Sequence, residues 1–550
     1  MALGAAVALA LLAISGGSGT DPRTPAALPG MPAPFLGTAV AGDGGLTAAV
    51  DAYGDVVDLR PQPAGRALID NPAARQAAGT VDAEGTGIVP RVSLDGGPAL
   101  AFWRADTVVQ RYLPGTNVVR TVARFGRVRV TVTVAARDEW LAIRVGTSGG
   151  EAITAAPSVG VNVEEGVRCA RQEQPDQLDL LCRVGRAGPV ATAAAAGPTG
   201  REVSRVIGSA AKDDRRWLAP ARRLGESAPA WAVQMYQRSL LTLRALTDRE
   251  NGAAAAGARD GWAYVWPRDA GAAAIALASA GYRSEATLIT RFLLGLDLEG
   301  AARFHGDGSP VPGRAAQGDA VGWTAAAAEA SGLIASAKHA ARILGDSYPV
   351  PWRNRADYQE GEPGNFLGNA IASGAPDFGA SIGASNSGAR AGGDFAPRRG
   401  LVRRAGDPGS GLDSAAAWAV RPFATPALYP RVRSTLRGLA AERTPFGITP
   451  GEGWSGGVDP WMAPTAWSAW SLAALARDPG ANRRAARSDR RLALALLADL
   501  RRAATPAGAL PERVDAVHGI PTSTTPLAWP HAFTILALRE LWPGPGAAAL

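Results

Sequence analysis

The chain has few of the residues that build metal sites. Its 550 residues include two cysteines, Cys169 and Cys182, and four scattered histidines. Because no Cys/His spacing typical of a metal site occurs, we expect neither a metal ion nor another cofactor. The cysteines flank a polar turn between two strand-like segments. A disulfide across a hairpin is therefore one expectation, and two free buried thiols are the alternative.

Lysine is almost absent. Lys212 and Lys338 are the only two, so the formal charge of +8 comes from arginine. The arginine-containing runs 214–223, 398–404 and 482–491 carry acidic neighbours or have helical spacing, which is typical of a solvated helix face. We therefore expect no nucleic-acid partner.

The sequence also lacks a hydrophobic run long enough to cross a bilayer. Its apolar stretch Ala2–Ile14 is too short for ~30 Å of hydrocarbon but fits the core of a secretory signal or a membrane anchor. A segment rich in Pro, Ala and Gly follows. We assign 1–34 to this signal or anchor and a linker, and expect a protein that is secreted or held at the membrane. The oligomeric state is left open.

Residues 35–200 have the texture of β structure. Apolar and polar residues alternate in 46–61, 117–136 and 140–149, and Gly-containing turns interrupt them. Period-two alternation at short spacing predicts an antiparallel β-sandwich. We expect a linker over 201–227.

The period changes near residue 228. Apolar residues now recur every three or four positions, as in amphipathic helices. The expected helices are 228–248, 269–280, 284–296, 319–332, 414–420, 461–476, 492–503 and 527–541. About a dozen helices within 228–550 predict a helical toroid, with functional loops gathered at one end.

One stretch, GWAYVWPRDAG at 261–271, stands out for its chemistry. Alternating aromatic residues up to Trp266 run into a Pro-Arg-Asp step, and Pro267 suits the first turn of a helix. Rings beside Arg268 and Asp269 could stack on a sugar and bind its hydroxyls. A buried aromatic cluster capped by an ion pair is the alternative.

Four later loops carry further polar and aromatic candidates. They are Gln317 and Asp319 in 310–323, Glu360 and Glu362 in 355–368, Trp461 in 449–470, and Glu512 and Trp529 in 507–531. Asp319 could instead be a helix N-cap. Two separated carboxylates among aromatic residues suit glycoside cleavage, because one acid protonates the leaving oxygen while a second group acts on the opposite face. In an inverting enzyme the two stand about 6.5–9.5 Å apart.

Three motifs give these loops a family resemblance. YVWPRDA at 264–270, LPER at 510–513 and PLAW-x-HAF at 526–533 resemble the bacterial glucoamylase-like enzymes of glycoside hydrolase family 15. The resemblance implies a β-sandwich followed by an (α/α)6 barrel, the six-hairpin glycosidase architecture. It also implies an exo-acting, inverting α-glycosidase that degrades an oligo- or polysaccharide.

The resemblance also implies roles for individual residues. DYQE at 357–360 matches the family's acid position, which makes Glu360 the general acid, and Glu512 matches the base that activates water. Arg268 and Asp269 match the pair that grips the terminal sugar. The other substrate-binding candidates are Trp266, Gln317, Asp319, Trp461 and Trp529.

The chain departs from the family pattern at several positions. Gln359 replaces a Trp, Gly361 follows the acid where many members have Glu, and Arg513 replaces a Gln. The family's arginine around the cleaved bond has no counterpart in 444–454. Recognition of the leaving sugar, the sugar itself and its linkage therefore stay open.

Alternative interpretations remain. Asp357 and Glu362 are close enough in sequence to compete with Glu360 for the acid role. Residues 379–383 satisfy G-x-S-x-G, the esterase elbow around Ser381, but no strand precedes them and no helix follows. A non-catalytic, glycan-binding relative on the same scaffold is the stronger alternative to an enzyme.

Overall fold

The computed structural model describes residues 26–70, 87–149, 153–163, 166–185, 200–259, 262–333, 353–359, 361–372, 395 and 400–544. Some sequence-based predictions lie outside these residues: the apolar stretch Ala2–Ile14, the candidate acid Glu360 and the esterase candidate Ser381. Among the helices of the described ranges, none is both long and apolar enough to cross a membrane.

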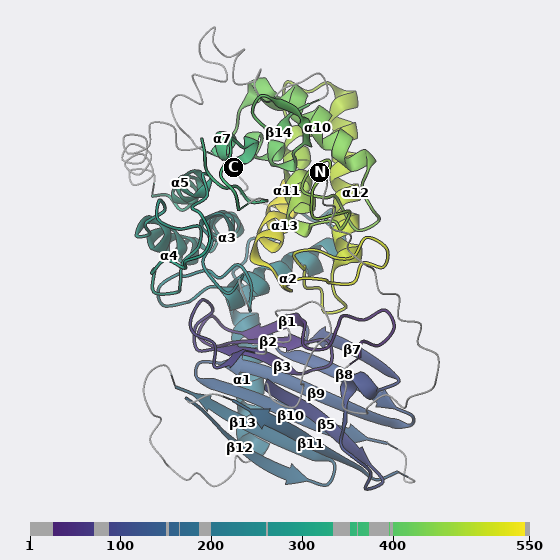
Figure 1. Ribbon diagram of the computed structural model, residues 1–550. Helices are drawn as coiled ribbons and strands as arrows, with labels where there is room; N and C mark the ends of the chain where they lie inside the picture. Colours follow the sequence, from purple (N-terminus) through teal and green to yellow (C-terminus); the bar gives the residue numbers. More distant parts are fainter. Residues whose placement is uncertain are drawn as a thin grey trace, which may run out of the picture.

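The N-terminal part of the chain forms two antiparallel sheets that pack against each other (Figure 1). The first sheet contains β1 (Gly37–Gly42), β2 (Thr47–Asp51), β3 (Val56–Arg60), β4 (Ile69–Asp70), β5 (Gly87–Leu94), β6 (Leu100–Ala101) and β11 (Ala155–Asn162). The second contains β7 (Thr107–Tyr112), β8 (Val119–Phe125), β9 (Val128–Arg137), β10 (Trp140–Ser148), β12 (Val167–Gln174) and β13 (Gln177–Val184). A short 3-10 helix, η2 (Phe102–Arg104), follows β6. This two-layer arrangement is the one that the alternating sequence predicts.

Sequence alternation explains these strands. In β8 every second residue, from Val119 to Phe125, is buried between the sheets. The predicted turns occur at Gly54 and Gly126, which adopt φ values of 92° and 58° that side chains disfavour. In contrast, β1, β2 and β3 are buried on both faces. Helices cover the second face, and Thr47 Oγ1 in β2 donates to the carbonyl of Ala245 at 3.0 Å.

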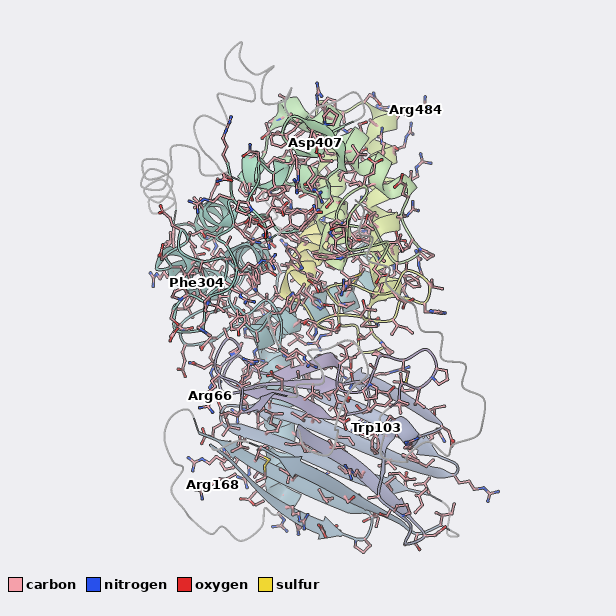
Figure 2. The ribbon with its side chains drawn as sticks, in the orientation of Figure 1. Arg66, Trp103, Arg168, Phe304, Asp407 and Arg484 are labelled. Atoms are coloured by element: carbon pink, nitrogen blue, oxygen red, sulfur yellow. A yellow bond between two sulfur atoms is a disulfide. The ribbon has the colours of Figure 1, made fainter. Side chains whose placement is uncertain are left out.

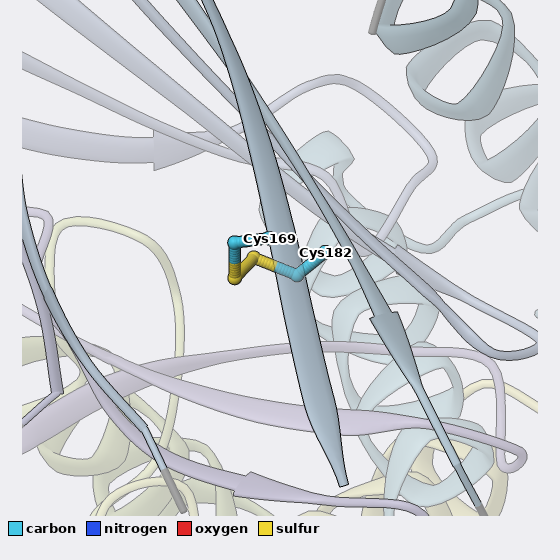
Figure 3. Close-up of a disulfide and its surroundings, with 2 residues drawn as sticks. All are labelled: Cys169 and Cys182. Carbon is cyan, nitrogen blue, oxygen red and sulfur yellow. A yellow bond between two sulfur atoms is a disulfide. The ribbon is translucent and has the colours of Figure 1, made fainter. Parts of the chain in front are cut away.

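A disulfide joins the last two strands of the second sheet. Cys169 in β12 and Cys182 in β13 lie directly opposite each other in the register (Figure 3). The next element, α1 (Gly200–Leu218), packs against β9, β10 and β13. It lies in the stretch where the sequence suggested a linker, and its charged residues outnumber the apolar ones that it buries. The domain boundaries themselves stay a prediction.

The rest of the described chain is mainly helical. Its helices are α2 (Ala230–Leu246), α3 (Pro267–Ala280), α4 (Arg283–Leu294), α5 (Ala320–Ala330), α7 (Leu367–Ala372), α10 (Tyr429–Ala441), α11 (Met462–Leu475), α12 (Arg483–Ala503) and α13 (Ala528–Leu541). A hairpin of β14 (Val402–Arg404) and β15 (Asp407–Leu412) precedes two 3-10 helices, η5 (Ser414–Ala419) and η6 (Pro426–Leu428).

Two expected helices differ from the structure. The segment 414–420 is the 3-10 helix η5 rather than an α-helix. The helix expected at 492–503 begins earlier, at Arg483, because the side chain of Asn482 accepts the N–H of Ala485 at 2.9 Å and caps it. Helix α10 was not expected at all.

The helices form an inner and an outer layer. Every residue of α3, α11 and α13 is buried, whereas α4 and α12 bury only one face. Helix α13 packs against α2, α3 and α11 (Figure 1). Alternation of buried and amphipathic helices is what a toroid of helical hairpins requires. Closure into an (α/α)6 barrel stays a prediction.

The sandwich and the helices share a buried interface. The guanidinium of Arg238 in α2 lies 3.7 Å from the ring centroid of Tyr112 and donates to the Thr116 carbonyl at 2.8 Å. Asn117 Nδ2 donates to the carbonyls of Gly42 and Leu241, both at 2.9 Å. In Figure 1, β1 lies at the side of the sandwich nearest α2 and α13. The sandwich therefore borders the helical part directly.

Candidate active site

Four helices begin near one another at one end of the helical part. Arg268, at the start of α3, lies over the ring of Trp529, near the start of α13, at 4.8 Å. It also reaches Asp319, which immediately precedes α5. The first residue of α11, Met462, donates its N–H to the carbonyl of Glu512 at 2.9 Å. Helix N-termini carry partial positive charge, so this place favours carboxylates and other electron-rich groups.

Arg268 is the buried centre of this group. Only 4% of it is exposed. Its Nη1 donates to Asp319 Oδ2 at 2.5 Å and to Gln317 Oε1 at 3.1 Å, while Nε lies 3.9 Å from Asp269 Oδ2. Burial alone would lower the pKa of the guanidinium, but the Asp319 and Asp269 charges outweigh it and raise the pKa. Arg268 is therefore held in place by acids from two helices.

Asp319 is not a helix cap. It occupies the N-cap position of α5 but makes no side-chain capping hydrogen bond. Its Oδ2 binds Arg268, and within the described residues Oδ1 has no hydrogen-bond partner. The N-cap alternative is thus wrong, because the carboxylate binds Arg268 and accepts no backbone N–H of α5.

Gln317 connects two candidate loops. Its Oε1 accepts from Arg268, and its Nε2 donates to the carbonyl of Asp357 at 2.5 Å. An isolated bridge between Gln317 and Ala356 runs alongside. We infer that this residue fixes the segment 353–359 against the start of α5, in addition to any contact with substrate.

Asp269 is protonated more readily than an ordinary aspartate. Its pKa is raised to about 7, chiefly by burial and also by the neighbouring Asp319 and Glu512 charges, while the charge of Arg268 opposes the rise. Glu512 must therefore lie close to the Arg268–Asp269 pair, even though about 240 residues separate them in sequence. The fold brings together two of the predicted groups that matter most.

Glu512 is buried and held by two donors. The indole Nε1 of Trp262 donates to Oε1 at 3.2 Å, and the hydroxyl of Ser523 donates to Oε2 in a short contact. The backbone N–H of Glu512 donates to the Thr524 carbonyl at 2.9 Å. Burial raises the pKa of the carboxyl, whereas Ser523, Arg513 and Trp262 lower it and leave a net rise. These donors orient the carboxylate and favour its ionised form.

The acid assignment is untested by the structure, because Glu360 lies outside the described residues. Its competitor Asp357 is fully buried, and its Oδ1 accepts the N–H of Gln359 at 2.9 Å. The other competitor, Glu362, lies on an exposed turn. Glu360 therefore stays the predicted acid.

A polar cluster lies directly beside this segment. Gln359, which replaces the family's Trp, points its Nε2 at the Tyr358 hydroxyl at 2.6 Å. That hydroxyl in turn donates to Asp413 Oδ1 at 2.7 Å. Burial raises the pKa of Asp413 to about 6, with Arg403 opposing the rise. The cluster anchors the loop that leads to the candidate acid.

The three predicted tryptophans lie around the same centre. Trp266 immediately precedes α3 and Trp461 immediately precedes α11. Trp529 packs edge-on to Trp467 at 5.4 Å, and half-buried Trp461 packs edge-on to Trp454 at 5.0 Å. Each predicted tryptophan has a buried indole N–H without a hydrogen-bond partner among the described residues.

Sequence reasoning missed several residues of the site. Trp262 and Ser523 bind Glu512, and Arg314 lies 5.1 Å from the ring centroid of Trp266. Burial and the charges of Arg268 and Arg303 lower the pKa of Arg314, despite attraction to nearby carboxylates. Trp262 was singled out as one of the aromatic residues of 261–271, but its contact with Glu512 was missed. Nothing local marks Ser523.

Within the described ranges, no three His, Cys, Asp or Glu side chains lie close enough together to hold a metal ion. The polar groups that do converge are those of Arg268, Asp269, Asp319 and Glu512. Together they offer the donors of one guanidinium and three carboxyl groups, of which Asp319 is bound to Arg268 and Glu512 is oriented by Trp262 and Ser523.

Solved structures similar to this chain have glycosidase names. A wild-type glycosidase matches with a TM-score of 0.45 at 19% identity, over 57% of this chain and 97% of its own. A glucoamylase from Saccharomycopsis fibuligera has a TM-score of 0.44 at 15% identity, over 58% and 96%. A glycoside hydrolase family 15 glucoamylase from Hypocrea jecorina has 0.43 at 13%, over 56% and 70%. Neither a family model nor a curated protein matches the chain.

Proposed function

We propose that this protein is an exported, exo-acting glycoside hydrolase that removes a terminal α-linked sugar with inversion, on a sandwich followed by an (α/α)6 barrel. The observation that carries the proposal is the convergence of Arg268, Asp269 and a buried, two-donor Glu512 at helix N-termini among tryptophans. Export rests on the apolar stretch Ala2–Ile14 alone.

In this proposal the terminal sugar is fixed by the buried pair. Asp269 accepts from its hydroxyls, and Arg268, already oriented by Asp319, donates to them. Indole N–H groups such as that of Trp529 supply further donors. Because these groups are held before substrate arrives, little ordering is required when the sugar binds.

The chemistry needs one proton donor and one proton acceptor. Glu360 would protonate the departing oxygen while Glu512 takes a proton from the water that attacks the anomeric carbon. The Ser523 and Trp262 donors support this division, because they favour the ionised form of Glu512 that a base requires. No covalent sugar–enzyme intermediate forms along this path.

The test is release of free monosaccharide from a panel of α-linked oligosaccharides. Wild type is compared with Glu512→Gln and with Glu442→Gln, an exposed glutamate that serves as the matched control. NMR records the anomer of the fresh product. We expect β-sugar from wild type and from Glu442→Gln, and loss of release for Glu512→Gln. An α-product, or full activity of Glu512→Gln, contradicts the inverting mechanism with this base.

A glycan-binding protein without activity is the second outcome of this test. The polar Gln359, which turns inward to Tyr358 where the family has an aromatic ring, is the observation that favours it. Oligosaccharide binding by calorimetry with no sugar release over long incubation would establish that function instead.

The acid is tested separately on a substrate with a reactive leaving group. Such a substrate needs little protonation, so Glu360→Gln should retain much more activity on it than on an oligosaccharide. Glu362→Gln should behave as wild type on both substrates. The reverse pattern would assign the acid to Glu362.

A further inference from the structure

The two donors of Glu512 both lie on segments that touch the N-terminal sandwich. Trp262 lies three residues after Arg259 in the sequence, and Ser523 lies two residues before Thr525. Gly257 brings the two segments together: a Cβ added there would lie 2.5 Å from Thr524 Cγ2 and 3.0 Å from Trp262 Cβ. The two donors are therefore packed as one unit.

The Trp262 side of this unit rests on Phe35, two residues before β1. The guanidinium of Arg259, only 1% exposed, donates to the carbonyl of Phe35 in a short contact. The carbonyl of Arg259 accepts the N–H of Trp262 at 3.3 Å. Arg259 thus connects the sandwich to Trp262, which carries one of the two donors.

The Ser523 side rests on the first residue of β1. A Cβ placed on Gly37 would lie 3.2 Å from Arg259 Cδ and 3.3 Å from the Thr525 carbonyl oxygen. Thr525 Oγ1 donates to the Ser523 carbonyl at 2.9 Å. Gly37 is therefore in contact with both segments, and a side chain there would require its neighbours to shift by a few tenths of an ångström.

Phe35 is held in an uncommon conformation at this contact. Its φ is 68°, in the left-handed region that bulky residues avoid, at a cost of about 1–2 kcal/mol. Its N–H donates to Asp51 Oδ2 at 2.8 Å, and its fully buried ring packs on Trp103 at 5.3 Å. The sandwich thus maintains a strained residue whose carbonyl binds Arg259, and such strain is typical of functional positions.

We propose that the sandwich edge at Phe35 and Gly37, acting through Arg259 and Thr525, positions the two hydrogen-bond donors of Glu512 and so sets the pH at which this carboxylate ionises. The proposal deepens the hydrolase function above and rests on Glu512 being its base. Arg259 and Gly37 are positioning residues and do not touch the substrate.

The perturbation that tests this is Gly37→Ala. The added methyl must push Arg259 or Thr525 by a few tenths of an ångström, which lengthens the donor contacts to Glu512. Weaker donors destabilise the ionised form, so the ionisation midpoint of Glu512 should rise by about 0.5–1 pH unit. Gly146→Ala, in β10, is the matched control, because nothing lies within 4 Å of its added Cβ.

Two measurements determine the ionisation midpoint of Glu512. The pH dependence of kcat/KM reports it through its acid limb, which should move upward in Gly37→Ala and stay in place in Gly146→Ala. The NMR signal of the Trp262 indole N–H, assigned with Trp262→Phe, reports the same ionisation without requiring activity. Arg259→Lys provides a second perturbation if Gly37→Ala does not fold.

The outcomes separate the proposal from its premise. If Gly37→Ala and Arg259→Lys both lower the stability but leave the ionisation midpoint of Glu512 unchanged, the contact is merely structural and the proposal is overturned. A wild type that releases no sugar refutes the hydrolase function, yet the Trp262 signal still decides whether the sandwich controls Glu512. An upward shift of the Glu512 ionisation midpoint in Gly37→Ala but not in Gly146→Ala supports the proposal.

Discussion

Ser523→Ala should change the pH profile of the enzyme more than its maximal rate. The Ser523 hydroxyl donates to Glu512 Oε2, and only the ionised carboxylate benefits fully from that donor. Hydrogen bonds to charged groups contribute about 1.5–3 kcal/mol. One pKa unit corresponds to about 1.4 kcal/mol, so the loss of this donor corresponds to a rise of about 1–2 units in the pKa of Glu512.

The sign follows from the role of a general base. In its proposed role as general base, Glu512 must be ionised to accept a proton from water, so the acid limb of kcat/KM against pH moves upward with its pKa. If the pKa of Glu512 rises by one unit, activity at pH values well below the acid limb falls about tenfold. Activity on the plateau above it should change little. Trp262→Phe, which removes a donor at 3.2 Å, should give a smaller shift in the same direction.

The matched control is Ser468→Ala in α11. Ser468 is a buried serine whose hydroxyl has no hydrogen-bond partner among the described residues. Its removal should leave the limb in place. If the limb stays fixed in Ser523→Ala as well, or moves equally in both variants, Ser523 does not control the ionisation of the base.

Three further predictions concern stability. Asp319→Ala leaves Arg268 buried without its closest partner, so the free energy of unfolding by urea should fall by about 3–5 kcal/mol; unchanged stability would show that the pair contributes nothing. The folded pKa of Asp269 is raised from 3.8 to about 7, so between these values the unfolded carboxyl is ionised while the folded one keeps its proton. The free energy of unfolding therefore falls by about 1.4 kcal/mol per pH unit as the pH rises from 3.8 to about 7. Asp269→Asn should flatten this part of the plot of stability against pH. Replacing Cys169 and Cys182 together by Ala opens a loop with a sequence separation of 13 and should lower stability by about 3 kcal/mol while sugar release stays unchanged; altered release would link the disulfide to the site.

Local pattern accounts for most of the elements that the sequence predicted. Alternation in 117–136 gave β8 and β9 with a turn at Gly126, because every second side chain of a strand faces one layer. Pro267 opened α3, since a first helical turn needs no N–H from it. Helix α1 was missed because its few buried residues are interspersed with charges.

The sequence by itself also supplied the chemistry of the site, through an Arg-Asp step at a helix start and a glutamate in a distant loop. Which groups meet was decided only by tertiary packing. Asp319 could as well have been a cap, and its pairing with Arg268 follows from where α3 and α5 begin. Likewise Trp262 reaches Glu512 from 250 residues away. Such contacts cannot be recognised from the spacing of apolar and polar residues, because that spacing reflects only the local backbone conformation. Burial instead determines which distant polar groups must form hydrogen bonds with one another.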